Sequence, residues 1–258
     1  EIIKGAEEAA WHNDHVLVIM SGGDNMVRAQ AAVNVLLDRE VEYIIYTAVF
    51  HHAITVPANI YDVPVVMANC YVADRSLPSV VPDEFMGGYD ATRVAIEKGH
   101  MRIGFVNVFS VQPTSIPASL GRWRGYQKAL EEAHIPYDET LVRHGKGDPD
   151  SGYVLTRELM EEANPPTVIF AGNDRTAMGV YDALRDLQLK IPEDVAVISF
   201  DNQEIIATAL RPSLSTMQLP HYEMGQWAVE YLIGSTPNAN GSPAQHVLRC
   251  PYVARTSI

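Results

Sequence analysis

The fold is decided by the stretch Thr167–Asp201, which reads TVIFAGNDRTAMGVYDALRDLQLKIPEDVAVISFD. Thr167–Ala171 is a short apolar run that stops at a glycine and an asparagine, which is typical of a buried parallel strand. A helix is predicted next, because apolar residues recur at steps of three and four, at Ala177, Val180, Tyr181, Leu184 and Leu187. Pro192 ends that helix, and Val195–Phe200 is a second buried strand. The stretch therefore predicts a complete strand–helix–strand unit.

Two polar residues follow the two strands of this unit. Strands joined by a helix of this length must run parallel, with a right-handed crossover. Asn173 and Asp201 then lie at the carboxyl ends of parallel strands, where open α/β sheets bind ligands. Asp174 is the expected N-cap of the helix between them. The geometry predicts a ligand site beside Asn173 and Asp201.

The same alternation of strands and helices continues through the rest of the chain. Near the start, a helical pattern over Ile2–Ala10 leads into an expected strand at His15–Met20. Further segments with strand or helix patterns are 27–37, 43–48, 63–68, 84–98, 120–133, 151–163 and 224–232. A second helix–strand repeat is expected to begin near Ala53. Breaks rich in Pro, Gly, Ser, Thr and Asn, at 109–119 and 235–243, are predicted to be loops.

Composition excludes several classes of protein. The chain has 258 residues, 47% of them hydrophobic, which indicates globular cores. Its formal net charge of −13 would repel nucleic acid over most of the surface. The two cysteines, Cys70 and Cys250, are too few for a disulfide framework and are expected to be buried thiols. No apolar run could span a bilayer and no signal peptide is recognisable, which favours a cytoplasmic location, although a processed secreted chain would look the same.

Patterns for metal or cofactor chemistry do not occur in the sequence. His12, His15 and the pair His51–His52 have no ligand partners at a zinc-like spacing. The glycine patterns of dinucleotide and phosphate-binding loops and the serine nucleophile elbow are also missing. We therefore expect no cofactor, no metal site and no catalytic residues.

Several spaced motifs together resemble the effector-binding core of the lactose/galactose repressor (LacI/GalR) family. Asn173–Gly179 matches N-D-x-x-A-x-G, and Ile191–Asp201 matches I-P-x-D-V-x-V-x-x-F-D. Arg122–Tyr126 matches R-x-x-G-Y, and 79–103 resembles the family segment S-V-x-x-D … G-H-x-x-I. The segment before Gln218 resembles P-x-L-x-T, and Arg255-Thr256-Ser257 resembles a terminal R-x-S/T. The resemblance extends over essentially the whole chain.

The resemblance implies a periplasmic-binding-protein-like α/β fold of two doubly wound parallel-sheet lobes. Three crossings join the lobes, with a ligand cleft between them. We expect the N-terminal lobe at 1–108 plus 219–237 and the C-terminal lobe at 109–218 plus 238–258, with the first crossing inside the loop at 109–119. The family's first strand and its DNA-binding headpiece precede the segment that this chain begins with.

The resemblance also implies which residues bind the ligand. Arg122 would be the cleft arginine, since a guanidinium suits neighbouring hydroxyls or a carboxylate; the alternative is a solvated first-turn arginine. Asp201 and Asn173 would accept and donate hydrogen bonds, or instead form an N-cap and a turn. Asn69 would be a polar strand-end residue. The segment 144–153 lacks the family's bulky ring, so the aromatic residues Trp123 and Phe50, as well as Tyr71 and Phe109, are candidates for stacking on a sugar; the alternative for each is a packing role.

The implied function is effector sensing by a LacI-type transcription regulator. A small polar metabolite, such as a sugar or sugar derivative, would change operator binding by a headpiece attached upstream. The unit would be a homodimer in the cytoplasm, with no membrane partner. A periplasmic or secreted solute-binding protein of the same fold is the alternative. An enzyme with paired carboxylates is disfavoured, because Asp201 has no acid or base partner recognisable in the sequence.

Overall fold

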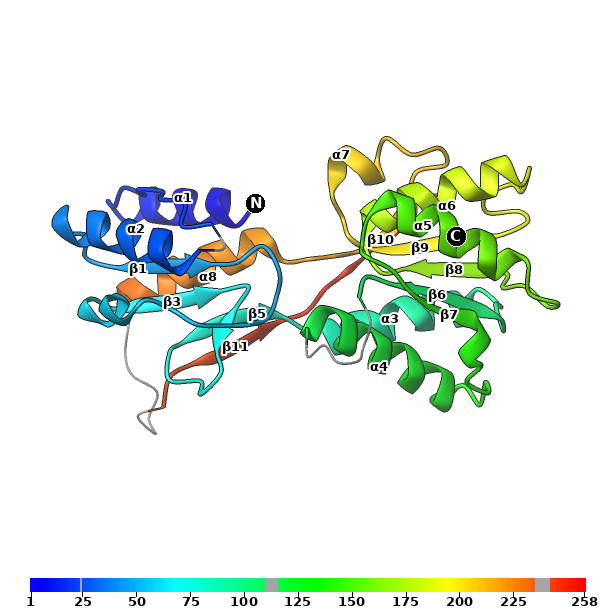
Figure 1. Ribbon diagram of the computed structural model, residues 1–258, viewed down its shortest axis with the longest axis horizontal. Coiled ribbons are helices and arrows are strands. Elements are labelled where there is room, and N and C mark those ends of the chain that lie inside the picture. The colour runs from blue at the N-terminus through cyan, green and yellow to red at the C-terminus, as the bar shows by residue number, and fades with distance from the viewer. Residues whose placement is uncertain (24, 110–115, 235–241) are drawn as a thin grey trace. The chain divides into compact units, whose positions relative to one another are not determined.

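A computed structural model describes residues 1–23, 25–109, 116–234 and 242–258. The chain forms two compact units (Figure 1). The N-terminal unit comprises Glu1–Pro82 and Pro220–Leu248, and the C-terminal unit comprises Asp83–Leu219 and Arg249–Ile258. The chain therefore passes from one unit to the other three times. Of the two predicted loops, 109–119 and 235–243, residues 110–115 and 235–241 lie outside the described residues.

The N-terminal unit contains a parallel sheet of order β1-β3-β5-β11, formed by Ile44–Thr47, Val65–Ala68, Ser79–Pro82 and Gln245–Leu248. Alternate residues of β3 enter two different cores. Val65 and Met67 pack with Val33 of α2 (Met26–Asp38). Val66 and Ala68 pack on the other side against α8 (His221–Gly234), near α1 (Ile2–His12). A short pair, β2 (Ala53–Ile54) and β4 (Tyr71–Val72), and a 3-10 turn, η1 (Ala58–Asp62), complete the unit.

The C-terminal unit contains a six-stranded sheet of order β12-β10-β9-β8-β6-β7, in which only β12 is antiparallel. In chain order its strands are β6 (Ile103–Asn107), β7 (Val142–His144), β8 (Val168–Ala171), β9 (Ala196–Asp201), β10 (Ser215–Gln218) and β12 (Tyr252–Val253). Its helices are α3 (Glu84–Glu97), α4 (Pro117–Glu132), η2 (Glu139–Leu141), α5 (Pro149–Met160), α6 (Asp174–Asp186) and α7 (Glu204–Ala207).

Helices cover both faces of this sheet, with α3 and α4 on one side and α5 and α6 on the other (Figure 1). Phe105, Phe170 and Ile198 point to the first side and pack with residues of α3 and α4. Ile169 and Val197, their alternating neighbours, pack with residues of α5 and α6. Each central strand is thus apolar on both faces, as the continuous runs of the sequence indicate. The predicted doubly wound parallel α/β fold is confirmed.

The unit boundaries differ from the prediction. The first crossing falls between Pro82 and Asp83 instead of within 109–119. β6 is hydrogen-bonded to β7 and β8 in the six-stranded sheet, so residues 83–108 belong to the C-terminal unit. Conversely, β11 pairs with β5 and belongs to the N-terminal unit. Strand pairing, which joins segments distant in sequence, sets these boundaries and cannot be read from loop composition.

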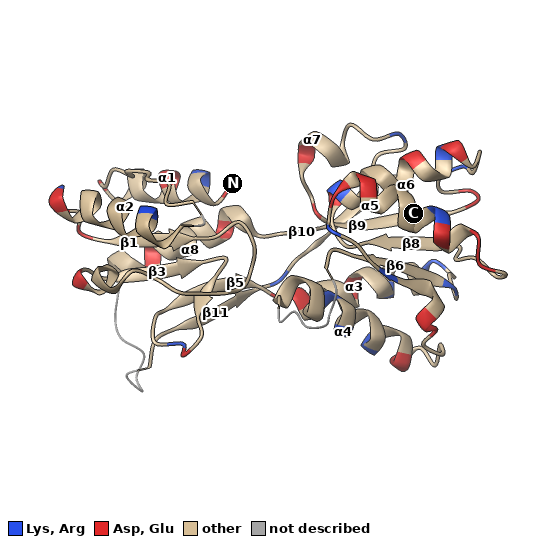
Figure 2. Ribbon diagram, in the orientation of Figure 1, with Lys and Arg blue, Asp and Glu red and all other residues tan. Residues whose placement is uncertain are grey.

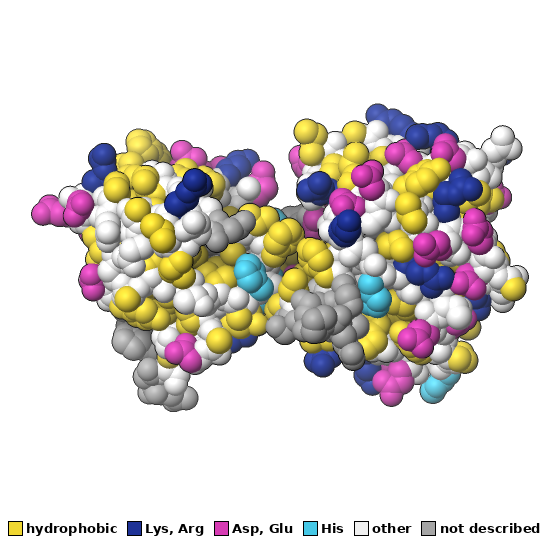
Figure 3. Space-filling view, in the orientation of Figure 1, with side chains coloured by type: hydrophobic (Ala, Val, Ile, Leu, Met, Phe, Trp, Pro, Cys, Tyr) yellow, Lys and Arg dark blue, Asp and Glu magenta, His cyan; other side chains and the backbone are white. Residues whose placement is uncertain are grey.

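Two predicted elements near the N-terminus do not form. Residues 15–20, expected to be a strand, have no strand assignment, and Val16, Ile19 and Met20 are 81%, 59% and 43% exposed. An apolar run becomes a strand only beside a hydrogen-bonding neighbour, and no described residue pairs with it. The expected helix near Ala53 is instead β2 and η1. Figure 3 shows hydrophobic side chains at the surface of the N-terminal unit.

Among the described residues, three pairs of helices make close contacts through glycines. A Cβ atom at Gly88 or Gly125 would collide with the backbone of the opposite helix in the α3–α4 pair. The same holds for Gly5 and Gly225 in α1–α8 and for Gly152 and Gly179 in α5–α6. Glycine lets two helix backbones approach until they touch. In the C-terminal unit, these contacts fix the ends of α3, α4 and α6 beside the strand ends.

Candidate functional site

Arg122 lies in the first half of α4 and is only 3% exposed. Its Nε donates to Glu84 Oε2 at 2.7 Å, and its Nη1 donates to the carbonyl oxygen of Gly172. Nη1 also lies 3.7 Å from Asp201 Oδ1. The structure therefore places Arg122 at the carboxyl ends of β8 and β9, not in solvent as the alternative interpretation had it.

The plane of the guanidinium is supported by an aromatic ring. Arg122 Cζ lies 3.7 Å from the centroid of Phe200, the residue before Asp201. Gly87 leaves room for this ring, since a Cβ there would lie 2.5 Å from Phe200 Cζ. Burial alone would lower the pKa of Arg122, but the carboxylates of Glu84 and Asp201 outweigh it and raise the pKa. Arg122 stays charged and is held rigidly by these contacts.

Asp201 ends β9 with a positive φ of 114°, and its side chain is 15% exposed. Its Oδ2 accepts a hydrogen bond from Gln203 Nε2 at 3.1 Å. The alternative role as an N-cap is not observed, because α7 begins at Glu204 and Gln203 occupies its N-cap position. Burial raises the pKa of Asp201 to about 7, against the opposing effect of the Arg122 charge. Burial therefore favours the neutral form of Asp201 more than in an exposed aspartate, and the nearby Arg122 charge favours the ionised form.

The N-cap of α6 is Asn173, not Asp174 as predicted. Asn173 Oδ1 accepts from the backbone N–H of Thr176 at 2.7 Å, and Nδ2 donates to Gly147 O at 3.1 Å. Asp174 is fully buried below the site. Its carboxylate accepts from the Gln203 backbone N–H at 2.7 Å and from the Thr216 hydroxyl at 2.9 Å. Asn173 therefore caps the helix and ties down the chain at Gly147, and Asp174 braces the loop after Asp201.

Trp123, the neighbour of Arg122, does not join this group of residues. Its ring packs against the core between the sheet and α3–α4, and its Nε1 lies 3.4 Å from the hydroxyl oxygen of Tyr137. Trp123 is therefore a packing residue in this structure.

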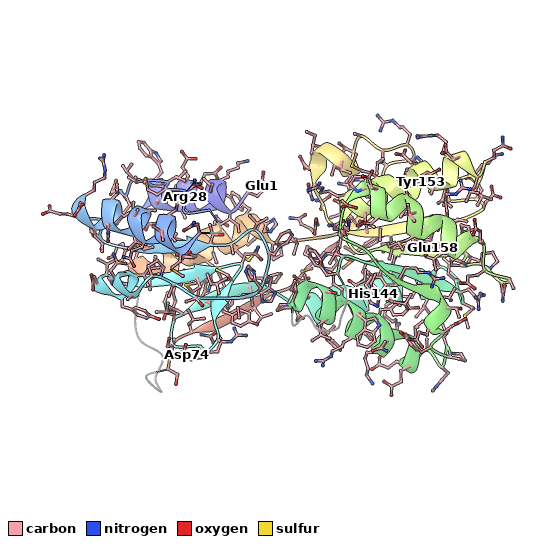
Figure 4. All side chains as sticks on the ribbon, viewed as in Figure 1. Glu1, Arg28, Asp74, His144, Tyr153 and Glu158 are labelled. Atoms are coloured by element: carbon pink, nitrogen blue, oxygen red, sulfur yellow. The ribbon has the colours of Figure 1, made fainter. Side chains whose placement is uncertain are left out.

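His144, labelled in Figure 4, is the last residue of β7, and its Nδ1 lies 3.2 Å from the Phe109 carbonyl oxygen.

Two of the predicted site residues belong to the N-terminal unit. Asn69 follows β3 with a φ of 58°, is 3% exposed, and donates from Nδ2 to the Ala48 and Val49 carbonyls at 3.0 and 3.3 Å. A left-handed conformation suits asparagine better than most residues. Phe50 is 52% exposed in the loop that Asn69 braces. Asn69 therefore positions the loop after β1, and Phe50 is part of that loop.

Glu84, Phe200 and Gln203 contact the predicted site residues Arg122 and Asp201, and sequence reasoning missed them. Figure 2 shows that acidic residues are common along the helices, so an acid in the first turn of α3 carries no signal of its own. Glu84 is buried only because α4 lies against α3, with Gly121 next to the Glu84 side chain. For these three residues the sequence offered one signal, which was the position of Phe200 directly before Asp201.

Stability should fall as the pH rises from about 4 to about 7. Burial raises the pKa of Asp201 to about 7 and of Asp174 to about 6. An aspartate in the unfolded chain titrates near pH ~4. Between these values the folded state holds protons that the unfolded state has released, so each carboxyl lowers stability by up to about 1.4 kcal/mol per pH unit.

Urea unfolding at a series of pH values from 4 to 8 measures this dependence. An Asp201→Asn variant should show a shallower fall than the wild type, most clearly between pH ~6 and ~7, above the pKa of Asp174. A variant with the same slope as the wild type would mean that Asp201 is already ionised at low pH in the folded protein.

The described parts of the chain contain no cluster of three or more His, Cys, Asp or Glu side chains that could hold a metal ion. Within the same residues, no helix is both long and apolar enough to cross a membrane. Both cysteines are buried free thiols.

Comparisons with known proteins agree with this architecture. The profile of the family described as periplasmic binding protein-like domain matches residues 92–258. The chain is 27% identical over 267 residues to the HTH-type transcriptional repressor PurR of Yersinia pestis bv. Antiqua (strain Antiqua), covering 100% of this chain and 75% of the repressor.

Two solved structures show the same fold. A putative LacI-family transcriptional regulator from Rhizobium etli superposes with a TM-score of 0.89 at 24% identity, covering 99% of this chain and 92% of that one. A complex of the transcriptional regulator CelR with cellobiose gives a TM-score of 0.78 at 25% identity, covering 100% and 78%. Family profile, repressor relative and fold agree, so the chain belongs to the periplasmic binding protein-like domain family, as the effector-binding core of a LacI/GalR-type transcription regulator.

Proposed function

We propose that the chain senses a small hydroxylated metabolite, a sugar or sugar derivative, through Arg122 and Asp201. One observation carries the proposal: a buried guanidinium and a carboxyl group lie 3.7 Å apart at the carboxyl ends of parallel strands. A hydroxyl group can accept from the first and donate to the second at the same time. The cellobiose bound to CelR, a relative of the same fold, supports a sugar as the ligand class.

The other predicted site residues have supporting parts in this proposal. Asn173 and Asn69 hold the loops at the ends of β8 and β3, each within its own unit. Phe50, 52% exposed, stays a proposed stacking residue, because Trp123 packs against the core. We assign direct contact to Arg122 and Asp201 first.

The ligand would act by changing operator binding in the full-length regulator. A chain with a net charge of −13 is a poor DNA ligand by itself, so the contact with DNA is proposed to come from a headpiece. A homodimer would match a palindromic operator, and a regulator of operator DNA works in the cytoplasm. The solute-binding alternative lacks this support, because the relatives described above are transcription regulators.

The test combines calorimetry with operator binding. The purified chain is titrated with cellobiose, ribose, glucose and other neutral sugars, and the operator affinity of the full-length regulator is measured with and without any sugar that binds. Effector coupling of about 1–3 kcal/mol corresponds to a change of roughly 5- to 150-fold in operator affinity, equal in both directions. A sugar that binds tightly yet leaves operator affinity unchanged would contradict the regulator function and favour solute binding.

Replacing Asp201 by alanine should weaken sugar binding by about 10- to 100-fold, the effect of losing a hydrogen bond to a charged group. Calorimetry on the wild type and on Asp201→Ala measures the ratio. Asp186→Ala is the matched control, because Asp186 accepts from Tyr153 in an exposed contact and is the last residue of α6, at the opposite end of the helix from Asn173. Equal affinities for the wild type and Asp201→Ala would remove Asp201 from the binding site.

A further inference from the structure

We propose that Glu84 is a specificity-determining residue, which makes the site select uncharged, hydroxyl-bearing effectors and reject carboxylates and phosphates. The inference rests on the proposed function, because it refines which ligand class binds beside Arg122. None of the motifs that carry the family resemblance assigns Glu84 a role in the site.

An arginine at a strand end is by itself an anion site. A guanidinium binds carboxylates and phosphates in a bidentate manner and is the preferred residue for both. Here the Glu84 carboxylate already occupies Arg122 Nε at 2.7 Å, and both side chains are only 4% exposed. The carbonyl oxygen of Gly172 accepts a hydrogen bond from Nη1, so a second donor of Arg122 is also occupied. Glu84 thus stands where an anionic ligand group would otherwise bind.

The charges around Arg122 reinforce this exclusion. The Arg122 guanidinium lies 2.7 Å from Glu84 and 3.7 Å from Asp201, and the buried carboxyl group of Asp174 lies behind the loop at Gln203. A further cation, Arg255, donates to Asn202 Oδ1 at 2.7 Å and to the Leu214 carbonyl oxygen at 2.8 Å. The charge of Arg122 is therefore already matched by the Glu84 carboxylate. In a buried environment, a further negative charge would be repelled strongly, whereas an uncharged hydroxyl would not.

The position of Glu84 is built by the fold and not by a flexible surface contact. Glu84 begins α3, directly after Asp83, whose side chain caps the helix by accepting from Met86 N at 2.9 Å. Gly121 of α4 lies against the Glu84 side chain, and a Cβ at Gly121 would be 2.7 Å from Glu84 Cβ. The close contact of α3 with α4 therefore holds Glu84 and Arg122 beside each other in a fixed geometry.

A second pair on the same helix offers a matched control. Arg93 and Glu97 of α3 are 2.9 Å apart, but their side chains are 39% and 62% exposed. The substitution Glu97→Gln removes the carboxylate partner of an arginine, as Glu84→Gln does, but the pair that it breaks is exposed to solvent. Any general effect of the lost charge on the protein should appear in both variants.

The first experiment measures the binding of matched pairs by calorimetry: glucose and glucuronate, ribose and ribose 5-phosphate, cellobiose and cellobionate. For the wild type, the neutral member of a pair should bind at least about tenfold more tightly than its acid. Glu84→Gln should reduce this ratio by at least about tenfold, with Glu97→Gln unchanged. An acid that binds the wild type as tightly as its neutral partner, or an unchanged ratio in Glu84→Gln, would overturn the proposal.

If none of these sugars binds, that result counts against the proposed sugar effector but not against the role of Glu84. A second measurement then tests the role of Glu84 by itself. Thermal unfolding is followed with and without millimolar sodium sulfate. Sulfate should raise the melting temperature of Glu84→Gln more than that of the wild type and of Glu97→Gln, because Arg122 then has a free anion-binding face. Equal shifts in the three proteins would overturn the role of Glu84.

Discussion

Replacing Arg122 by alanine is expected to lower the free energy of unfolding by about 3–5 kcal/mol and to abolish effector binding. The guanidinium is the partner of Glu84 and Asp201, and it fills the space over the Phe200 ring. Its removal leaves a carboxylate that is only 4% exposed without its cation. Breaking a buried ion pair by deleting one member is far more harmful than deleting both. Urea unfolding at pH 7 measures the loss.

The design of this test includes a control and a partial rescue. Arg124→Ala changes an exposed arginine two residues along the same helix and should alter stability by less than about 0.5 kcal/mol. The double variant Arg122→Met, Glu84→Met should recover part of the stability lost in Arg122→Ala, because it removes both charges and keeps the volume. If Arg122→Ala were as stable as Arg124→Ala, the Arg122 network would have no structural role.

Replacing Gly125 by leucine is expected to destabilise the protein by about 3 kcal/mol or more and to disrupt the site. A side chain at Gly125 would collide with the backbone oxygen of Phe85 and approach Tyr89 N at 2.5 Å, so α3 and α4 would have to separate. This separation would pull Glu84 away from Arg122, since the two residues lie on opposite helices of the pair. Stability and sugar binding should therefore be lost together.

Gly234→Leu provides the comparison for this helix-contact prediction. Gly234 is the last residue of α8, it is exposed, and nothing lies within 4 Å of a Cβ built there. The substitution should be neutral or slightly stabilising, because leucine has the higher helix propensity. Thermal and urea unfolding of both variants give the contrast. Similar stabilities for the two would show that α3 and α4 tolerate a wider separation.

Local sequence patterns predicted the elements of the central stretch closely. The strand–helix–strand unit expected over Thr167–Asp201 is observed as β8, α6 and β9. Both strands are buried runs in the sequence, and the helix has its apolar residues at helical spacing, so each element is specified by its own residues. The motif R-x-x-G-Y also has a direct physical reading, in which Gly125 permits the helix contact and Tyr126 donates from its hydroxyl to Ile103 O.

The sequence by itself determined the fold class and the family, because these depend on periodicity and on spaced motifs within short segments. It also predicted Arg122 and Asp201 as ligand-binding residues. The tertiary structure alone decided which unit residues 83–108 join, that residues 15–20 form no strand, and that Asn173 instead of Asp174 caps α6. It also revealed Glu84 as the partner of Arg122. These features depend on strand pairing and on the contact of α3 with α4, which join residues far apart along the chain.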